Sequence, residues 1–383
     1  MPRGRNGSQR VVLRSRSAMA ELTTWAAASD GHHTWKRFLD AWPRHDVFAK
    51  PSYLSLFLKE HHRVVCLHFS HDAGELIYPV IIRRLEELAF AKGSHGQYCD
   101  LVTAPFGTGG PYIRYADDEA RLLRAFFAAY EQWCHEEKVI VEYTTFPPIQ
   151  PCTLGYPGDV VERMPVVVKP LQGRDVLRDM NATRRNEVRR ALSSGLTVDV
   201  DICATGIDAF VATYVDTQRR HADFRDGLDM SGQGVRQLVD AVTPDVVLFH
   251  AVHAGRVIAS ALVLCSGVSL IYHRAASLTD ALHLRGAQLL LLSISEWGRD
   301  HGYEWLQIGG GTASDPEGSL FRYKASFTRQ PVVPLLVGRW VVNPTTYAEV
   351  NEARTRFYGT AASVDPRTGF FPAYRAPHTR APE

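Results

Sequence analysis

The stretch Leu248-Phe-His-Ala-Val-His-Ala-Gly-Arg-Val-Ile-Ala-Ser-Ala-Leu-Val-Leu264 decides the fold class of this chain. Apolar residues flank Ala254-Gly255-Arg256 on both sides, a pattern that predicts two antiparallel strands joined by a tight turn. His250 and His253 are three residues apart on one strand, so their side chains point to opposite faces and cannot share a metal ion. We expect a hairpin here and no metal site.

Helices and strands alternate outward from this hairpin. The periodicity predicts strands at 246–253, 257–265, 268–275 and 305–309, and helices at 175–193, 207–220 and 285–301. The order of elements from residue 166 onward resembles that of the preceding half. The pattern predicts an α/β (α+β) protein with two similar halves, each built on a mixed, largely antiparallel central sheet flanked by helices.

Length and composition agree with two folded domains. The chain has 383 residues, more than one hydrophobic core usually organises, and 45% of them are hydrophobic and 22% charged. No run of 18 apolar residues occurs, so no membrane-spanning helix is predicted. The formal net charge of +2 does not by itself indicate a nucleic-acid-binding protein.

Both the cysteines and the N-terminus indicate a cytoplasmic protein. The six cysteines lack any Cys-x-x-Cys spacing, which favours reduced thiols. Residues 1–18 carry several arginines but no apolar core of a secretory signal, so we expect a disordered basic arm. Serine hydrolase, nucleotide hydrolase and dinucleotide-binding motifs are absent from the sequence.

A basic segment precedes the hairpin. Residues 169–190 contain seven Lys or Arg and three Asp or Glu, and the predicted helix 175–193 places Arg178, Arg185 and Arg189 away from its apolar stripe. A solvated helical face and a surface for a polyanion explain this segment equally well.

The start of the helix at 285–301 is a second candidate site. Backbone amides at such a start suit a phosphate group, and Arg285 and Gly286 lie at this position. This helix start resembles the coenzyme A loop of GNAT-superfamily acetyltransferases, in which a second small residue follows the first glycine. Gln288 occupies that position here, so the resemblance disfavours a coenzyme A site.

Glycines and a lysine form the third candidate. Gly309 and Gly310 follow the predicted strand 305–309 and permit close approach of a ligand or of another backbone. Lys324 is one of only seven lysines among 43 basic residues. Its ammonium suits a phosphate or a developing oxyanion, although a solvated surface lysine is the plainer interpretation.

Together these segments resemble the Fem family of aminoacyltransferases, which build peptidoglycan interpeptide bridges from aminoacyl-tRNA and belong to the GNAT acyltransferase superfamily. The resemblance covers residues 35–347. It rests on the order and spacing of short motifs: Asp100-Leu-Val-Thr-Ala-Pro-Phe-Gly-Thr-Gly-Gly-Pro111, Thr183-Arg-Arg-Asn-Glu-Val-Arg-Arg-Ala191, Thr217-Gln-Arg-Arg220, Tyr272-His-Arg-Ala-Ala-Ser277 and Phe321-Arg-Tyr-Lys-Ala-Ser-Phe327.

The resemblance implies tandem GNAT-like domains at residues 19–165 and 166–334. It also implies that residues 335–383 cross back onto the first domain. The long helical hairpin that some members insert in the second domain is absent, because residues 201–246 carry no heptad run.

The resemblance also implies a reaction. An amine of the acceptor attacks the ester carbonyl of aminoacyl-tRNA, an amide forms and the tRNA is released, with no cofactor. The implied roles are catalysis by Lys324 and Tyr272; acceptor binding by Arg220, Lys59, Phe321, Gly309 and Gly310; and tRNA or phosphate binding by Arg178, Arg185, Arg189, Arg285 and Gly286.

Three functions remain open at this point. The first is an aminoacyl-tRNA-dependent transferase acting on a cell-wall precursor or on a small natural-product amine. The second is a GNAT N-acyltransferase that uses coenzyme A thioesters. The third is a tandem domain without activity that binds tRNA or a partner.

Overall fold

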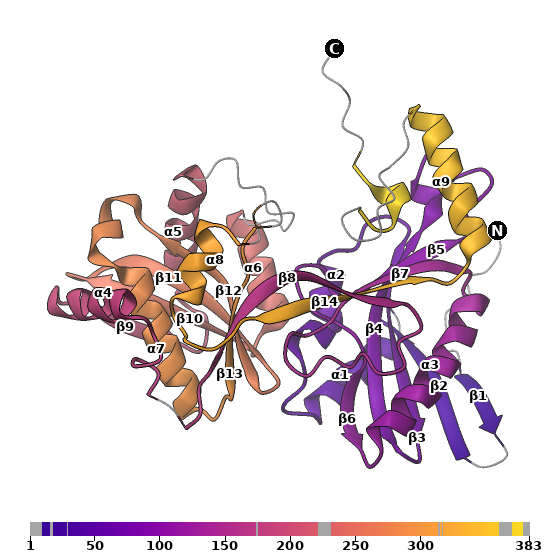
Figure 1. Ribbon diagram of the computed structural model, residues 1–383, viewed down its shortest axis with the longest axis horizontal. Helices are drawn as coiled ribbons and strands as arrows, with labels where there is room; N and C mark the ends of the chain where they lie inside the picture. The colour runs from indigo at the N-terminus through magenta and orange to yellow at the C-terminus, as the bar shows by residue number, and fades with distance from the viewer. Residues whose placement is uncertain are drawn as a thin grey trace. The chain divides into compact units, whose positions relative to one another are not determined.

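The computed structural model describes residues 10–15, 18–28, 30–173, 175–220, 231–312, 315, 317–359 and 370–377 (Figure 1). Two compact units divide the chain. The first comprises residues 1–43, 48–163 and 335–383, and the second comprises residues 44–47 and 164–334. Within the described parts of both units, the predicted mixed and largely antiparallel sheets flanked by helices are confirmed.

The first unit is built on a sheet in which neighbouring strands run in the order β1-β2-β3-β4-β5-β7-β14, with β6 beside β4. All the pairs described are antiparallel except β5 with β7. The strands are β1 (Arg10–Ser15), β2 (Ala18–Ala26), β3 (His62–His71), β4 (Gly74–Arg84), β5 (Cys99–Val102), β6 (Tyr112–Ala116), β7 (Val139–Thr145) and β14 (Val333–Val341).

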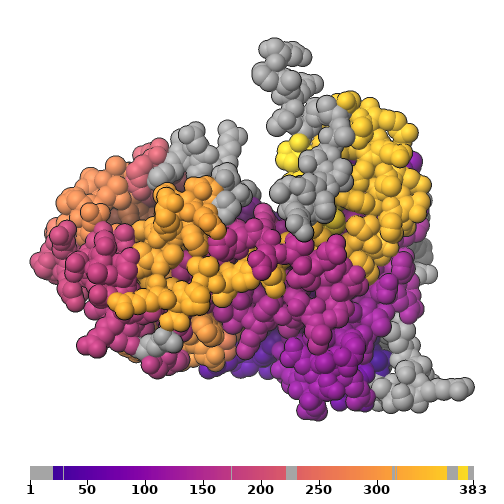
Figure 2. Space-filling view, viewed as in Figure 1, coloured from indigo at the N-terminus to yellow at the C-terminus, as the bar shows by residue number. Residues whose placement is uncertain are grey.

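Helices complete the first unit. They are α1 (Gly31–Asp40), α2 (Pro51–Ser55), α3 (Glu119–Glu136) and α9 (Pro344–Tyr358), with short 3-10 turns at Val47–Ala49, Leu85–Glu87 and Ala373–Arg375. The α3 helix contributes Leu122, Phe126 and Tyr130 to the core. The C-terminal segment belongs here because β14 pairs with β7, and Figure 2 shows the outer face of α9 in yellow at the surface.

Charged side chains anchor the end of this C-terminal segment. Arg375 donates to the fully buried Asp100 and to Glu87, each at 2.5 Å, and His62 lies 2.9 Å from Glu87. Burial raises the pKa of Glu87, but the hydrogen bond from His62 and the charge of Arg375 outweigh it and lower the pKa to about 2. The segment is therefore held by interactions that need an ionised carboxylate.

The N-terminal prediction is partly wrong. Residues 1–9, 16 and 17 of the expected disordered arm lie outside the described residues, but Arg10–Ser15 form strand β1. Arg10 pairs with Thr23 and Ser15 with Ala18 in an antiparallel ladder. The short run Val11-Val12-Leu13 favours a strand, and a two-residue connection to β2 brings the partner directly alongside.

The second unit repeats the arrangement. Its strands are β8 (Asp159–Pro170), which begins in the first unit, β9 (Thr197–Asp201), β10 (Val246–His253), β11 (Arg256–Ser266), β12 (Ser269–Ser277) and β13 (Trp305–Gly309). Their order is β8-β13-β12-β11-β10-β9, and β12 with β13 is the parallel pair. The predicted hairpin is confirmed as β10 and β11, with His250 opposite Ser260.

Both faces of the second sheet are covered by helices. These are α4 (Ala182–Ser193), α5 (Ile207–Arg220), α6 (Gly232–Val242), α7 (Gly286–Asp300) and α8 (Ser319–Ala325), with a 3-10 turn at Thr279–Leu284. Ala259, Ala261 and Val263 of β11 join the core under α4 and α7, whereas the alternate residues face the other way, and α5 contacts the same strands (Figure 1).

Candidate functional site

Lys324 lies in the short helix α8 and reaches the end of β13. Its Nζ donates to the carbonyl oxygen of Gly310 at 2.8 Å. Gly309 has φ +90°, and a Cβ there would lie 3.2 Å from the Lys324 Nζ, so this close approach favours glycine. Burial and, to a smaller extent, the charge of Arg274 together lower the pKa of Lys324 from 10.5 to about 8. The structure therefore brings together Lys324, Gly309 and Gly310, which the sequence singled out.

Tyr272 and Phe321 pack against the hydrophobic core of the second unit. Tyr272 of β12 and Phe321 of α8 are partly buried and pack against the core cluster under α4 and α7. Burial, with a smaller contribution from Tyr323, raises the pKa of Tyr272 well above its ordinary value, so the phenol stays protonated at neutral pH. Tyr272 can therefore serve as a hydrogen-bond donor.

A β-bulge lies directly beside Tyr272. Tyr272 pairs with Val263 and Arg274 with Leu262, which leaves His273 without an opposite residue. Bulges change the direction of side chains and are frequent next to active sites. Burial lowers the pKa of His273 well below its ordinary value, so this imidazole is neutral.

Arg220 forms hydrogen bonds at the end of strand β12. It ends α5, and its Nη1 donates to the carbonyl oxygen of Ser277 at 3.2 Å and to the hydroxyl of Thr279 at 2.8 Å. Thr217 also exchanges hydrogen bonds with Ser277. These contacts fasten α5 to the end of β12, and binding of the acceptor by Arg220 stays a prediction.

Lys59 belongs to the first unit. It is exposed and lines a hollow of about 380 Å³ whose walls also hold acidic residues, a histidine, an alanine and a second lysine: Glu60, His61, Glu86, Glu87, Ala89 and Lys92. Its role as an acceptor contact stays a prediction.

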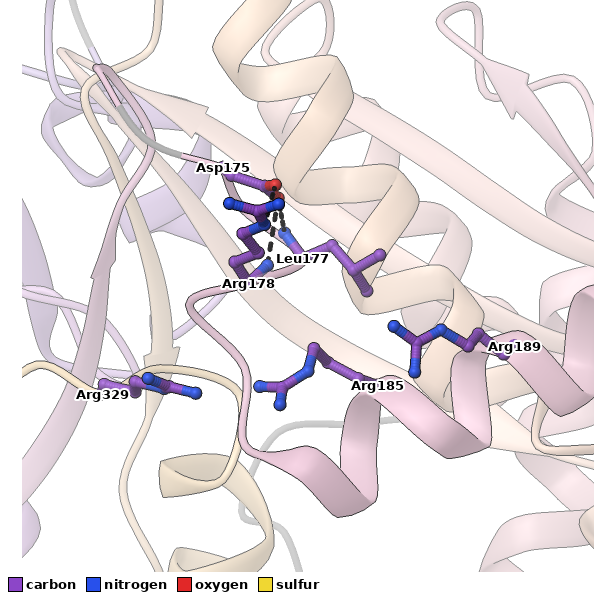
Figure 3. A pocket seen from close by; sticks show the side chains of 6 residues that line it. All are labelled: Asp175, Leu177, Arg178, Arg185, Arg189 and Arg329. Carbon is purple, nitrogen blue, oxygen red and sulfur yellow. Dashed lines mark hydrogen bonds and ion pairs between the residues drawn. The ribbon is translucent and has the colours of Figure 1, made fainter.

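A basic hollow of about 400 Å³ opens at the start of α4. It is lined by Asp175, Leu177, Arg178, Arg185, Arg189 and Arg329, and we call it the arginine hollow. Arg185 and Arg189 project from successive turns of α4, while Arg329 points toward Arg185 from the opposite side (Figure 3). Four guanidinium groups against one carboxylate make the hollow suited to a polyanion.

The predicted helix at 175–193 is shorter in the structure. The helix begins only at Ala182, because the side chain of Asn181 accepts from the amide of Arg184 and caps it there. Asp175 instead caps a separate turn by accepting from the amides of Leu177 and Arg178, each at 3.0 Å. Arg178 therefore lies on a turn and not on the helix, which opens the space that the hollow occupies.

Arg329 is a member of the hollow that the sequence does not indicate. It follows Lys324 by five residues and lies about 140 to 150 residues from the other arginines of the hollow. Its backbone amide donates to Asp179 Oδ1 at 3.2 Å, which fixes it beside the turn that carries Arg178. No local pattern around Arg329 signals this proximity.

The start of α7 is less suited to a phosphate than the sequence suggests. Arg285 adopts the left-handed conformation, and its Nε lies 3.9 Å from Glu187 Oε1. A Cβ on Gly286 would lie 3.0 Å from the Cβ of Ala259, so this glycine lets α7 pack closely on β11. Gln288 is buried. The guanidinium of Arg285 is partly engaged by Glu187, which also pairs with Arg184.

Two features are absent from the part of the chain that the structure describes. Within it, no three or more His, Cys, Asp and Glu residues gather in a way that could hold a metal ion. None of its helices combines the length and the apolar character needed to cross a membrane.

Comparison with known proteins identifies the fold. Residues 178–325 match the family described as Acetyltransferase (GNAT) domain. The structure of FemX has a TM-score of 0.62 and 12% identity, covering 83% of this chain and 97% of that chain. The C-terminal domain of a putative lysylphosphatidylglycerol synthetase from Agrobacterium fabrum has a TM-score of 0.52 and 13% identity, covering 85% and 96%.

No curated protein sequence matches the chain. At these identities the structural likeness defines the fold alone. The GNAT-type fold expected from the Fem resemblance is confirmed, and the second unit carries the GNAT domain match.

Proposed function

We propose that this chain is an aminoacyltransferase that forms an amide between an amino acid carried by aminoacyl-tRNA and an amine of the acceptor. Such a donor is made in the cytoplasm, where we expect the chain to act. The GNAT domain match and the likeness to FemX and to the C-terminal domain of a putative lysylphosphatidylglycerol synthetase support an acyltransferase.

The observation that carries the proposal is the arginine hollow in the unit that also holds Lys324. Arg178, Arg185, Arg189 and Arg329 line a hollow that suits several phosphate groups of a nucleic-acid backbone. A small uncharged donor would need no such surface. We infer that the hollow binds the backbone of the tRNA and thereby orients its charged end.

Lys324 supplies the chemistry in this proposal. With a pKa of about 8, its ammonium is mostly protonated at neutral pH. The acceptor nitrogen attacks the ester carbonyl carbon, and the ammonium stabilises the resulting oxyanion. The bond from carbon to the ribose oxygen then breaks, and the proton of the attacking amine leaves with that oxygen, which gives an amide and free tRNA.

The start of α7 favours this donor over coenzyme A. A coenzyme A pyrophosphate would lie at the amides that follow Arg285, and Glu187, 3.9 Å from the Arg285 guanidinium, would compete with it for that side chain. Gln288 fills the position at which a small residue would let the backbone wrap the phosphates. Transfer from acyl-coenzyme A is therefore the second candidate, and no cofactor is part of the proposed reaction.

The test uses the full chain with a mixture of charged tRNAs and a panel of amines, including nucleotide-linked cell-wall precursors and small biosynthetic amines. Mass spectrometry should find an amide product that disappears after ribonuclease treatment of the tRNA and is lost with Lys324→Met. Lys36→Met, which changes an exposed lysine of the first unit, should leave the product unchanged. Product that survives ribonuclease, or that forms only with acyl-coenzyme A, rejects the proposal.

A further inference from the structure

A fully buried lysine lies beneath the arginine hollow. Lys169 is on β8 with an exposed fraction of 0%. Its Nζ donates to Asp179 Oδ2 at 2.7 Å and to the carbonyl oxygens of Val176 at 2.9 Å and Phe327 at 3.0 Å. Its ammonium therefore fastens two separate segments to β8: the turn before α4 and the segment after α8.

Asp179 makes the matching connections from the other side of the pair. Its Oδ2 accepts from the hydroxyl of Thr328 at 2.7 Å, and its Oδ1 accepts from the amide of Arg329 at 3.2 Å. Burial raises the pKa of Asp179, but the hydrogen bonds from Lys169 and Thr328 outweigh it and lower the pKa, so the carboxyl is ionised. Each member of the pair thus bonds to the segment that carries Arg329.

The segments that the pair joins carry the functional groups of the proposed site. Val176 and Asp179 flank Arg178 in the turn that walls the hollow. Phe327 follows Lys324 by three residues. One backbone hydrogen bond, from the amide of Asn181 to the carbonyl oxygen of Ser326 at 3.1 Å, runs alongside these contacts and also links the start of α4 to the end of α8.

Stability alone does not explain a buried ion pair. Removing two charges from water costs about as much as their attraction returns, and well-packed apolar residues of similar volume are often as stable. What apolar residues cannot replace is the set of directed hydrogen bonds to Val176, Phe327, Thr328 and Arg329.

We propose that Lys169 and Asp179 are positioning residues that hold the arginine hollow and Lys324 in one fixed arrangement. Both side chains are buried, so the pair acts through these segments and not by direct contact with a substrate. It fixes the two segments on which polyanion binding and the reacting ammonium depend, so its removal alters both together. The inference rests on the proposed function, which assigns RNA binding to the arginine hollow and catalysis to Lys324.

The experiment replaces the pair by apolar residues in the double variant Lys169→Met/Asp179→Leu. Three measurements are made on the full chain: the thermal unfolding midpoint, the affinity for uncharged tRNA and for a 12-nucleotide single-stranded RNA by fluorescence anisotropy, and the pH midpoint at which an amine-specific reagent labels Lys324, read by mass spectrometry. The matched control is Arg256→Met/Asp280→Leu, which removes an exposed ion pair of the same unit.

We expect the double variant to fold, to bind both RNAs at least fivefold more weakly, and to shift the labelling midpoint of Lys324 upward from about 8 by at least one pH unit, because the ammonium becomes better solvated. The control should change neither RNA affinity nor labelling. A folded double variant in which both readouts keep their wild-type values, or in which only one of them changes, overturns the proposal.

If the double variant does not fold, Thr328→Val decides the matter. This change removes the hydrogen bond to Asp179 and the one that Thr328 accepts from the Gln330 amide, and it leaves the ion pair intact. A two- to threefold effect on both readouts supports the proposal, and unchanged values contradict it. Neither readout needs charged tRNA or turnover, so a failure of the transferase assay would be distinguished from a failure of this inference.

Discussion

Substituting Lys324 by methionine should make the protein more stable and less active. The substitution keeps most of the side-chain volume and removes the ammonium and its hydrogen bond to Gly310. A residue that is kept for catalysis and not for folding often lowers stability. Lys324 fits this description because its ammonium is largely buried and its pKa is lowered.

The size of the effect follows from the pKa. A fall from 10.5 to about 8 corresponds to about 3 kcal/mol of penalty on the protonated form in the folded protein. Substitution by methionine relieves this penalty, but loss of the hydrogen bond to the Gly310 carbonyl costs the variant about 1 kcal/mol. We therefore expect the free energy of unfolding of Lys324→Met at pH 7 to exceed that of the wild type by about 2 kcal/mol.

The pH dependence has a definite sign. Below pH 8 the lysine is protonated in both folded and unfolded chains, so the full penalty is present. Between pH 8 and 10.5 the unfolded chain binds more protons than the folded one, and the stability of the wild type rises. The advantage of Lys324→Met should shrink across this window and disappear near its upper end.

Urea unfolding at pH 7, 9 and 10.5 measures the difference, and the turnover assay measures the loss of activity. Removal of one donor to an oxyanion lowers turnover by about 100-fold or more. A variant that is less stable than the wild type at pH 7, with a difference independent of pH, refutes the burial argument. Unchanged turnover removes Lys324 from the site.

Three further outcomes can be checked with single variants. Gly309→Ala should cost about 1–2 kcal/mol of stability, because φ is +90° there, and should lower turnover by displacing Lys324; urea unfolding and the transferase assay measure both. Arg375→Ala should destabilise the first unit by about 3 kcal/mol. The stability that Glu87 contributes, present above pH 4.5 and lost as the pH falls toward 2, should be smaller in this variant when unfolding is followed against pH. Arg185→Ala should reduce the slope of log affinity against log salt for single-stranded RNA by about 0.7, as measured by anisotropy titrations.

Sequence periodicity was a good guide to the sheets and a poor one to short or capped helices. The hairpin of β10 and β11 was predicted because uninterrupted apolar runs flank a turn. Helix α6 was missed because Gly232 and Gly234 lie in its first turn, where they indicate a loop, although Ser231 caps the helix. In the basic segment the apolar stripe predicts a helix from residue 175, but the cap at Asn181 makes the helix begin at Ala182.

The candidate site was predictable only where it is local in sequence. Glycines after a strand and a rare lysine in a family-like motif pointed to Gly309, Gly310 and Lys324, and the structure joins them. Arg329 could not be found, because its place beside α4 depends on Asp179, far away along the chain. Long-range hydrogen bonds of this kind leave no periodic signal in either segment.

The basic segment shows why counted charges do not define a surface. Its excess of positive charge includes Lys169, which is buried and paired with Asp179, and Arg184, which is paired with Glu187. Neither of these two paired charges adds to an exposed basic surface. The arginine hollow is instead made by Arg178, Arg185 and Arg189 together with Arg329, which lies outside the counted segment. The buried pair therefore contributes to a polyanion site through geometry, by holding Arg329 in place, and not through its own charge.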